Sequence, residues 1–176
     1  MSAHTVLSYI AAGDHRLMRK VNGWPAPRWI RFWMVAATKL GDGWLWYAMG
    51  LIILLFGGVG RYQTLLASGL ACACGSLLFV KLKRICGRQR PCEIEPHCWA
   101  SLLPPDRFSF PSGHSITACA IATPLSLHYP GLAIGLGFCA LSIAVSRVIL
   151  GLHFLSDVIA GCALGFGLGL CSYLLI

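Results

Sequence analysis

Long apolar stretches recur along this chain of 176 residues, and they limit the folds that it can adopt. Five stretches carry at most one charged residue each: 44–59, 62–80, 116–127, 132–145 and 154–176. A helix needs about 20 apolar residues to cross the hydrocarbon core of a bilayer, and several of these stretches approach or exceed that length. They lack the alternation of polar and apolar residues that a membrane-spanning β-barrel requires. The sequence therefore predicts an all-α bundle of transmembrane helices.

The composition of the chain also favours a membrane protein. Only 11% of the residues are charged and 57% are hydrophobic, whereas a typical soluble domain carries roughly 25% charged residues. The first 27 residues lack the apolar core and cleavage site of a signal peptide, so we expect the internal segments to direct insertion. The formal net charge is +8, but the aromatic side chains lie within apolar stretches, which argues for lipid packing rather than nucleic-acid binding.

We expect one domain over residues 1–176, built from five to six membrane helices. The five clear spans are predicted at about residues 44–60, 61–85, 112–129, 131–150 and 153–175. Residues 1–27 predict a short amphipathic or irregular surface segment, and residues 28–40 predict a helix that is too short to cross a bilayer alone. Basic residues in both segments suit a cytoplasmic flank or lipid headgroups. Glycines at every fourth position of the last span predict close helix packing: Gly161, Gly165 and Gly169.

The order of the spans brings distant polar residues to one side of the membrane. The second span ends on the side that holds the polar loop 87–111, the third span leaves that side, and the fourth returns to it. The loop and the turn 146–153 are therefore expected at the same membrane surface. The polar residues that this arrangement gathers are Lys83, Arg90, Ser112, His114, Arg147, His153 and Asp157.

The charges of this cluster favour an anion over a metal ion. Three cations, Lys83, Arg90 and Arg147, accompany two histidines and one carboxylate. This surplus of positive charge repels a divalent metal, although the histidines and the carboxylate alone would suit zinc. Residues 112–114 follow a proline and are predicted to open a helix, whose N–H groups and positive dipole end attract anions. Gly113 allows a ligand to approach the backbone closely. Phosphate satisfies these donors together, so we expect neither a metal nor a cofactor.

The two histidines supply the groups that phosphoryl transfer needs. Residues four apart share one face of a helix, so the carboxylate of Asp157 is expected to reach the imidazole of His153 and fix its tautomer. A neutral imidazole held in this way attacks phosphorus and forms a phosphohistidine. His114 is available to protonate the departing oxygen and then to activate water. The cations would stabilise the charge on the equatorial oxygens of the transition state.

Cysteines and one aspartate outside this cluster have simpler interpretations. Six of the nine cysteines fall inside predicted spans, where cysteine behaves as a small hydrophobe. Cys92 and Cys98 lie in the polar loop, where a disulfide and a zinc site with His97 are alternatives. Asp42, which lies between two glycines, is predicted to form a turn or a helix cap.

Three sequence blocks in the cluster have the order and spacing of a known family. The blocks are Lys83-x6-Arg90-Pro91, Pro111-Ser112-Gly113-His114 and Ser146-Arg147-x5-His153-x3-Asp157. Together they resemble the type 2 phosphatidic acid phosphatase (PAP2) family, and they cover about 75 residues of the apolar core. The resemblance implies that His153 is the nucleophile, that Asp157 orients it and that His114 is the acid and base. It also implies a phosphate-binding set: Lys83, Arg90, Ser112, Gly113 and Arg147.

The same resemblance implies an integral-membrane enzyme that hydrolyses a lipid phosphate or diphosphate. The substrates that we consider are undecaprenyl diphosphate, phosphatidylglycerophosphate, phosphatidate and phosphorylated lipid A, with the first favoured on the breadth of the family. A lipid phosphotransferase, which passes the phosphoryl group to another lipid, is the alternative. A non-catalytic anion-binding membrane protein is a third hypothesis, and the intact nucleophile, carboxylate and acid argue against it. The resemblance places the protein in the bacterial cytoplasmic (inner) membrane, with its site facing the periplasm or exterior.

Overall fold

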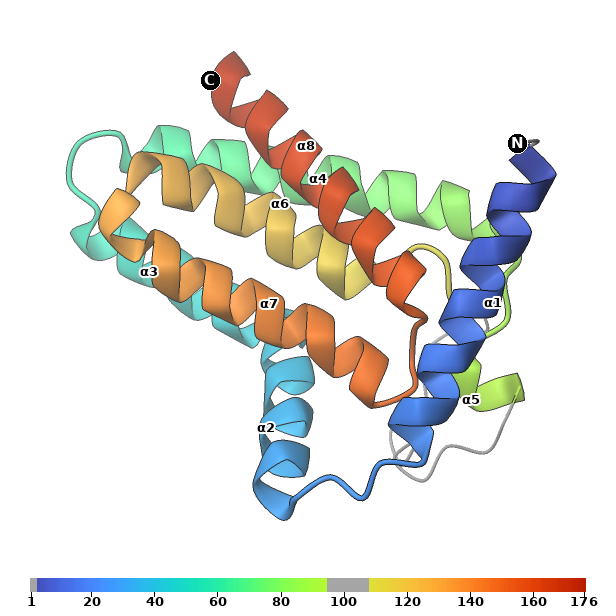
Figure 1. Cartoon of the computed structure of the whole chain (residues 1–176). Coiled ribbons are helices and arrows are strands. Elements are labelled where there is room, and N and C mark those ends of the chain that lie inside the picture. Colours follow the sequence, from blue (N-terminus) through green and yellow to red (C-terminus); the bar gives the residue numbers. More distant parts are fainter. Residues whose placement is uncertain (1–2, 95–107) are drawn as a thin grey trace.

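The computed structural model describes residues 3–94 and 108–176, in which helices joined by short connections make up most of the chain (Figure 1). Within the described residues, strand-like pairing is limited to one isolated bridge between Gln89 and Phe108. The all-α prediction is therefore confirmed. The helices are α1 (Ala3–Asn22), α2 (Arg28–Lys39), α3 (Leu45–Phe56), α4 (Arg61–Cys86), α5 (Pro91–Ile94), α6 (Gly113–His128), α7 (Ala133–Ile149) and α8 (Leu155–Leu175), with short helical turns at Leu40–Trp44 and Pro130–Leu132.

Helix α6 lies at the centre of the bundle. It contacts α4, α7 and α8, and its residues Ala118 and Ala120 are fully buried. Its 16 residues give a length of about 24 Å, which is shorter than the hydrocarbon core of a typical bilayer. Four other segments of the described chain are long and apolar enough to cross a membrane: Arg28–Phe56, Arg61–Cys86, Pro130–Ile149 and Leu155–Leu175. These four segments pack around α6.

The first candidate span differs from the predicted one. Residues 44–60 do not form an independent span, because α3 has only 12 residues, or about 18 Å of helix. Instead α2, the bend at Leu40–Trp44 and α3 form one segment of 29 residues. Gly43 has a φ of 125° inside the bend, a conformation that side chains with a Cβ rarely adopt. The bend turns the Gly-Asp-Gly segment toward the end of the bundle that holds the polar cluster.

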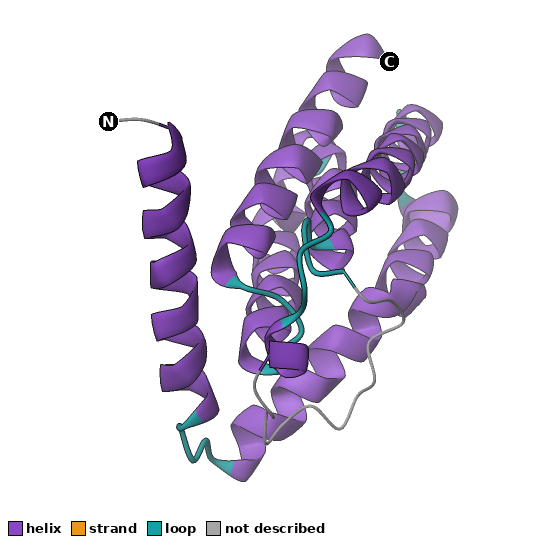
Figure 2. Ribbon diagram, turned by 90° about the vertical axis from the view of Figure 1, so that its right-hand side faces the viewer, coloured by secondary structure: helices purple, strands orange, loops and turns teal. Residues whose placement is uncertain are grey.

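The N-terminal segment is a regular helix. Helix α1 lies across the end of the bundle where α8 begins, and the two views show that it is joined to α2 by a short connection (Figures 1 and 2). Much of its surface is exposed, but Asp14 and Met18 are each only 6% exposed. The prediction of an amphipathic surface segment therefore holds for Ala3–Asn22. The sequence pattern did not predict that one face of this helix packs on α7 and α8.

Close packing between α6 and α8 depends on the three glycines predicted for this role. Gly161, Gly165 and Gly169 are all buried and lie against the backbone and small side chains of α6. A Cβ on Gly165 would lie 2.3 Å from the carbonyl oxygen of Ile116, and one on Gly161 would lie 2.7 Å from that of Ser112. The first turn of α8 is thereby held against the start of α6, which brings two parts of the polar cluster together.

Substitution of Gly165 tests this packing. Gly165→Ala places a methyl group against a backbone carbonyl that cannot move aside, so we expect a loss of about 1–3 kcal/mol of stability. The matched control is Gly167→Ala on the same helix, where a Cβ meets nothing within 4 Å. This control should be neutral or slightly stabilising, because alanine is the better helix former. The measurement is the midpoint of thermal unfolding in detergent, and equal midpoints for the two variants would contradict the packing role.

Candidate active site

A cavity of about 450 Å³ opens among the ends of α4, α6 and α7 and beside the turn before α8. Six of the eight predicted site residues contribute to its wall: Lys83, Arg90, Gly113, His114, Arg147 and His153. Lys83, Arg90, Arg147 and His153 are each less than 8% exposed. Segments separated by up to 70 residues therefore meet as the order of the spans predicted. The convergence of these residues on one site is confirmed, while their chemical roles remain predictions.

The loop that carries His153 is fixed by arginine residues. The backbone N–H groups of Leu152 and His153 both donate to the carbonyl oxygen of Arg147 at 3.0 Å. Arg90 donates through Nη1 to the carbonyl oxygen of Leu152 at 2.7 Å. Gly151, with a φ of 67°, allows the chain to reverse after α7. The imidazole is thus presented from a tightly bonded turn and not from a helix.

This turn corrects one prediction about His153 and Asp157. Helix α8 begins at Leu155 after an extended Phe154, so His153 precedes the helix and the two residues do not share a helical face. Nδ1 of His153 still lies 3.9 Å from Oδ2 of Asp157. That distance supports an electrostatic interaction and is too long for a hydrogen bond. The i,i+4 spacing correctly predicted that His153 and Asp157 lie close together, but the backbone between them is a turn followed by the start of α8 and not one continuous helix.

The surroundings of His153 define its tautomer. Nη1 of Arg90 lies 3.2 Å from Nε2 of His153, and an arginine side chain has donors but no acceptor. Nε2 must therefore accept, which leaves the proton on Nδ1, the atom nearer Asp157. This is the tautomer that a nucleophilic Nε2 requires, because the lone pair then lies on Nε2.

Burial keeps His153 neutral. The side chain is 2% exposed, and desolvation, followed by the charges of Arg147, Arg90 and Lys83, lowers its pKa well below the ordinary value. The backbone of Ser109 acts weakly in the opposite direction. A neutral imidazole retains its lone pair, which is the form that attacks an electrophile.

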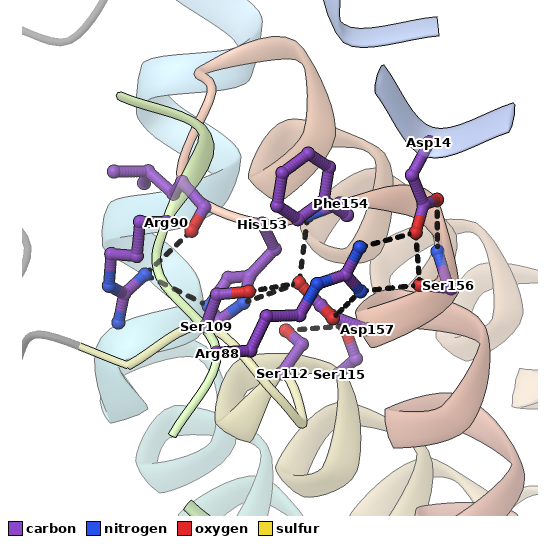
Figure 3. Close-up of polar contacts among 11 residues, drawn as sticks. Asp14, Arg88, Arg90, Ser109, Ser112, Ser115, His153, Phe154, Ser156 and Asp157 are labelled. Carbon is purple, nitrogen blue, oxygen red and sulfur yellow. Dashed lines mark hydrogen bonds and ion pairs between the residues drawn. The ribbon is translucent and has the colours of Figure 1, made fainter. Parts of the chain in front are cut away.

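Asp157 is held by three donors at the start of α8 (Figure 3). Its Oδ2 accepts from the hydroxyl of Ser109 and, at 2.9 Å, from the backbone N–H of Phe154. Its Oδ1 accepts from Nη1 of Arg88 at 2.6 Å. The carboxylate is completely buried, so these bonds replace the water that it loses. Asp157 stabilises the first turn of α8 as well as facing His153.

Ser112 and Gly113 have different positions at the start of α6. Ser112 is fully buried and is not part of the cavity wall; its backbone N–H donates to the carbonyl oxygen of Asp157 at 3.1 Å, and its hydroxyl accepts from Ser115. Gly113 lines the cavity beside Phe79, whose ring would lie 2.8 Å from a Cβ at this position. The same ring lies 4.4 Å from Nζ of Lys83. The glycine thus makes room for the aromatic ring that supports the lysine.

Several polar residues of the site were not predicted as such. Asp42 was expected to form a turn or helix cap, but its Oδ1 lies 2.7 Å from Nε2 of His114, and both residues line the cavity. Arg147 donates to the hydroxyl of Thr38 on α2. Arg88 and Asp14 form part of the network around Asp157. These contacts join residues 69 to 109 positions apart, and local sequence patterns carry no signal for them.

Metal ligands do not cluster in residues 3–94 and 108–176, where no group of three or more His, Cys, Asp or Glu side chains could hold an ion. The two histidines of the cavity have other partners: His114 bonds with Asp42, and His153 with Arg90. The suggested disulfide or zinc site involves Cys98 and His97, which lie outside the described residues. Those two alternatives therefore remain predictions.

The fold and the site define an integral-membrane helical protein with a cationic centre that contains two histidines. A model of the PAP2 superfamily matches residues 64–176, more than half of the chain. The chain therefore belongs to the PAP2 superfamily, and the resemblance noted from its three sequence blocks is confirmed.

Comparisons with individual proteins agree with this assignment. Lipid A 1-phosphatase from Rhizobium etli is 39% identical over 93 residues, which cover 51% of this chain and 40% of that protein. Phosphatidylglycerophosphatase B from Bacillus subtilis is 33% identical over 162 residues, which cover 84% of this chain and 74% of that protein. The crystal structure of Aquifex aeolicus LpxE superposes with a TM-score of 0.76 at 27% identity, covering 89% of this chain and 92% of that one. The chain spans about two fifths of the length of the lipid A 1-phosphatase that it matches.

The low pKa of His153 predicts how acid changes the stability of the protein. An unfolded chain binds a proton at histidine as the pH falls through about 6.5, whereas the folded protein does not bind it at His153 until the pH is much lower. Folding stability at this site is therefore lost as the pH falls below about 6.5, by up to about 1.4 kcal/mol per pH unit. His153→Gln removes this proton linkage.

The measurement is the midpoint of thermal unfolding in detergent between about pH 7 and about pH 5. We expect the midpoint to fall further in the wild type than in His153→Gln, and the difference between them cancels the titration of the other groups. His128→Gln, at the far end of α6, controls for the loss of an imidazole as such. Parallel pH profiles for the wild type and His153→Gln would show that His153 is not held neutral.

Proposed function

We propose that this protein is a lipid phosphate phosphatase whose nucleophile is Nε2 of His153. The observation that carries the proposal is the contact between Nε2 and Nη1 of Arg90. It leaves the lone pair of the imidazole facing a guanidinium in a cavity wall that also contains Lys83 and Arg147. A phosphate that bound to these cations would take the Nη1 donor of Arg90 away from Nε2 and place its phosphorus beside the freed lone pair.

The first half of the proposed reaction forms a phosphohistidine. Nε2 of His153 attacks phosphorus, and the bond between phosphorus and the leaving oxygen breaks as the nitrogen–phosphorus bond forms. His114, when protonated, gives its proton to the leaving oxygen, and Asp42 stabilises the imidazolium at 2.7 Å. The imidazole of His153 becomes positively charged, and the carboxylate of Asp157 at 3.9 Å offsets that charge.

The second half returns the site to its starting state. Water attacks the phosphorus of the phosphohistidine and passes a proton to His114, and the nitrogen–phosphorus bond breaks. The products are inorganic phosphate and the neutral imidazole. Because three cations neutralise the transferring group in both halves, the mechanism requires no metal ion. A lipid phosphotransferase would share the first half and differ only in the acceptor of the second.

A lipid substrate is supported by the position of the cavity and by the relatives. Apolar side chains from two of the candidate spans line the cavity beside the cations, including Tyr47, Phe79 and Val80. The relatives described above act on lipid A and on phosphatidylglycerophosphate, as their names state. We propose a phosphorylated or diphosphorylated lipid of the bacterial envelope, undecaprenyl diphosphate included, with the site at the outer face of the cytoplasmic membrane.

Release of inorganic phosphate from lipids in detergent tests the function. The wild type should release phosphate in the presence of a chelator, and His153→Gln should lower kcat by about 1,000-fold or more, because the nucleophile is lost. The matched control, His128→Gln, alters a histidine outside the cavity and should retain activity. Wild-type turnover in His153→Gln would reject the nucleophile, and complete loss of turnover in chelator would reject the metal-free mechanism.

A substrate panel separates the proposed lipids. It compares undecaprenyl diphosphate, phosphatidylglycerophosphate, phosphatidate and lipid A phosphates by kcat/KM. Labelled phosphate that appears on a second lipid, in place of free phosphate, would support the phosphotransferase instead.

The basicity of the leaving oxygen tests the role of His114. An alkoxide from a lipid phosphate needs a proton as it departs, whereas p-nitrophenolate is stable without one. His114→Ala should therefore lower kcat/KM by about 100-fold or more for a lipid phosphate and far less for p-nitrophenyl phosphate. Asp42→Asn should show the same pattern with a smaller loss, because it removes the partner of His114 and not the acid. Equal losses on the two substrates would indicate that His114 binds phosphate and does not protonate the leaving group.

A further inference from the structure

One buried carboxylate connects the N-terminal helix to the proposed catalytic centre. Asp14 lies in α1 and is 6% exposed. Its Oδ2 accepts from Nη2 of Arg88 at 2.7 Å and from the hydroxyl of Ser156, and its Oδ1 accepts from the backbone N–H of Ser156 at 3.1 Å. Figure 3 shows this carboxylate reaching the start of α8 from the ribbon of α1. Both oxygens are used, so the side chain has one well-defined orientation.

Arg88 is shared between two carboxylates. While Nη2 bonds with Asp14, Nη1 donates to Asp157 at 2.6 Å and to the hydroxyl of Ser156 at 2.8 Å. The guanidinium also lies 4.1 Å from the centroid of the Phe154 ring. Arg88 is not part of the cavity wall, in contrast to Arg90 two residues later. Its contacts therefore hold the back of the site and not the ligand.

The charges explain why both carboxylates are needed. A guanidinium with Asp157 as its only anionic partner would be attracted to any phosphate that entered the nearby cavity. Asp14 supplies a second anion on the side away from the cavity and keeps the fork of donors in place. Asp14 also accepts from the backbone N–H of Ser156 in the first turn of α8. Phe154, the residue that precedes this helix, has no side-chain acceptor for that N–H group.

We propose that Asp14 and Arg88 are positioning residues that hold the carboxylate of Asp157 in place beside His153. The N-terminal helix, which carries Asp14, thereby contributes to catalysis. This inference rests on the proposed phosphatase function. It predicts a particular kinetic signature. Because neither side chain lines the cavity, their loss should lower kcat with little change in KM. A displacement of the carboxylate by about 1 Å is enough to cost up to about 100-fold in rate.

The test compares Asp14→Asn, Arg88→Met and the double variant in phosphate release from the best lipid of the panel. An asparagine at position 14 replaces one of the two acceptor oxygens with a donor, so it cannot bind both Arg88 and Ser156 as the carboxylate does. We expect each single variant to lower kcat by about 10- to 100-fold, with KM within about threefold of the wild type. The loss in the double variant should be smaller than the product of the two single losses, because Asp14 acts partly through Arg88 and partly through Ser156. Asp14→Glu, which keeps the charge, should recover part of the lost rate.

Two controls match the changes in charge of Asp14→Asn and Arg88→Met. Glu93→Gln removes an exposed carboxylate on α5, and Arg16→Met removes an exposed cation two residues from Asp14 on α1. Both should retain the kcat of the wild type. The midpoint of thermal unfolding is measured for every variant. A loss of kcat in a variant that stays folded at the assay temperature, with KM preserved, supports positioning.

Three results would overturn the inference. An unchanged kcat in Asp14→Asn would show that the contact has no role in the reaction. A rise in KM with kcat preserved would show that the pair binds substrate. Additive losses in the double variant would show that the two residues act independently. In each case the wild type remains active, whereas a wild type that releases no phosphate from any lipid would reject the proposed function and the positioning role together.

Discussion

The buried carboxylate of Asp157 joins the segments that make up the polar end of this bundle. The side chain of Asp157 accepts hydrogen bonds from Ser109 before α6, from Arg88 after α4 and from the backbone of Phe154. The backbone carbonyl oxygen of Asp157 accepts from the N–H of Ser112. A hydrogen bond to a charged group stabilises a fold by roughly 1.5–3 kcal/mol, and leaving a buried charge without its partners costs more. The cavity exists in its described form because these segments meet at one anion. Asp157 also lies 3.9 Å from the imidazole of His153, and the chemical role that we propose for it is additional to this structural one.

The balance of charge around the cavity differs from that around Asp157. On the Asp157 side, two carboxylates face one guanidinium, and hydroxyl and backbone donors complete the network. On the cavity side, the three cations Lys83, Arg90 and Arg147 outnumber the carboxylate of Asp42, and His153 has a lowered pKa. The positive N-terminus of α6 adds to this potential. The surplus of positive charge therefore lies at the cavity, where a bound anion with several oxygens would neutralise it.

Much of this arrangement was predictable because membrane crossings restrict connectivity. Once the spans predicted at 61–85, 112–129 and 131–150 are placed, alternation of direction decides which loops share a surface, and it brought Lys83, His114 and Arg147 together without any knowledge of their contacts. Close packing of the last helix was likewise predictable from the spacing of its glycines, although its partner, α6, was not. The bend at Gly43 was not, because apolar length alone does not show that two short helices form one segment.

The contacts of Asp14 and Asp42 were beyond the reach of the sequence for a related reason. Their partners, Ser156 and His114, lie 142 and 72 residues away, and a single acidic residue between glycines or on a surface helix carries no directional information. His153 and Asp157 show the opposite case: the correct pair was recognised, but Gly151 and the extended Phe154 replace the expected helix with a turn.

The separation of 142 residues between Asp14 and Ser156 also has a consequence for biogenesis. Helix α1 precedes α8 in the chain and is therefore synthesised before it. The carboxylate of Asp14 therefore has no access to its partner until the start of α8 has been synthesised. The hydrogen-bond network around Asp157 is therefore incomplete in a nascent chain that still lacks α8.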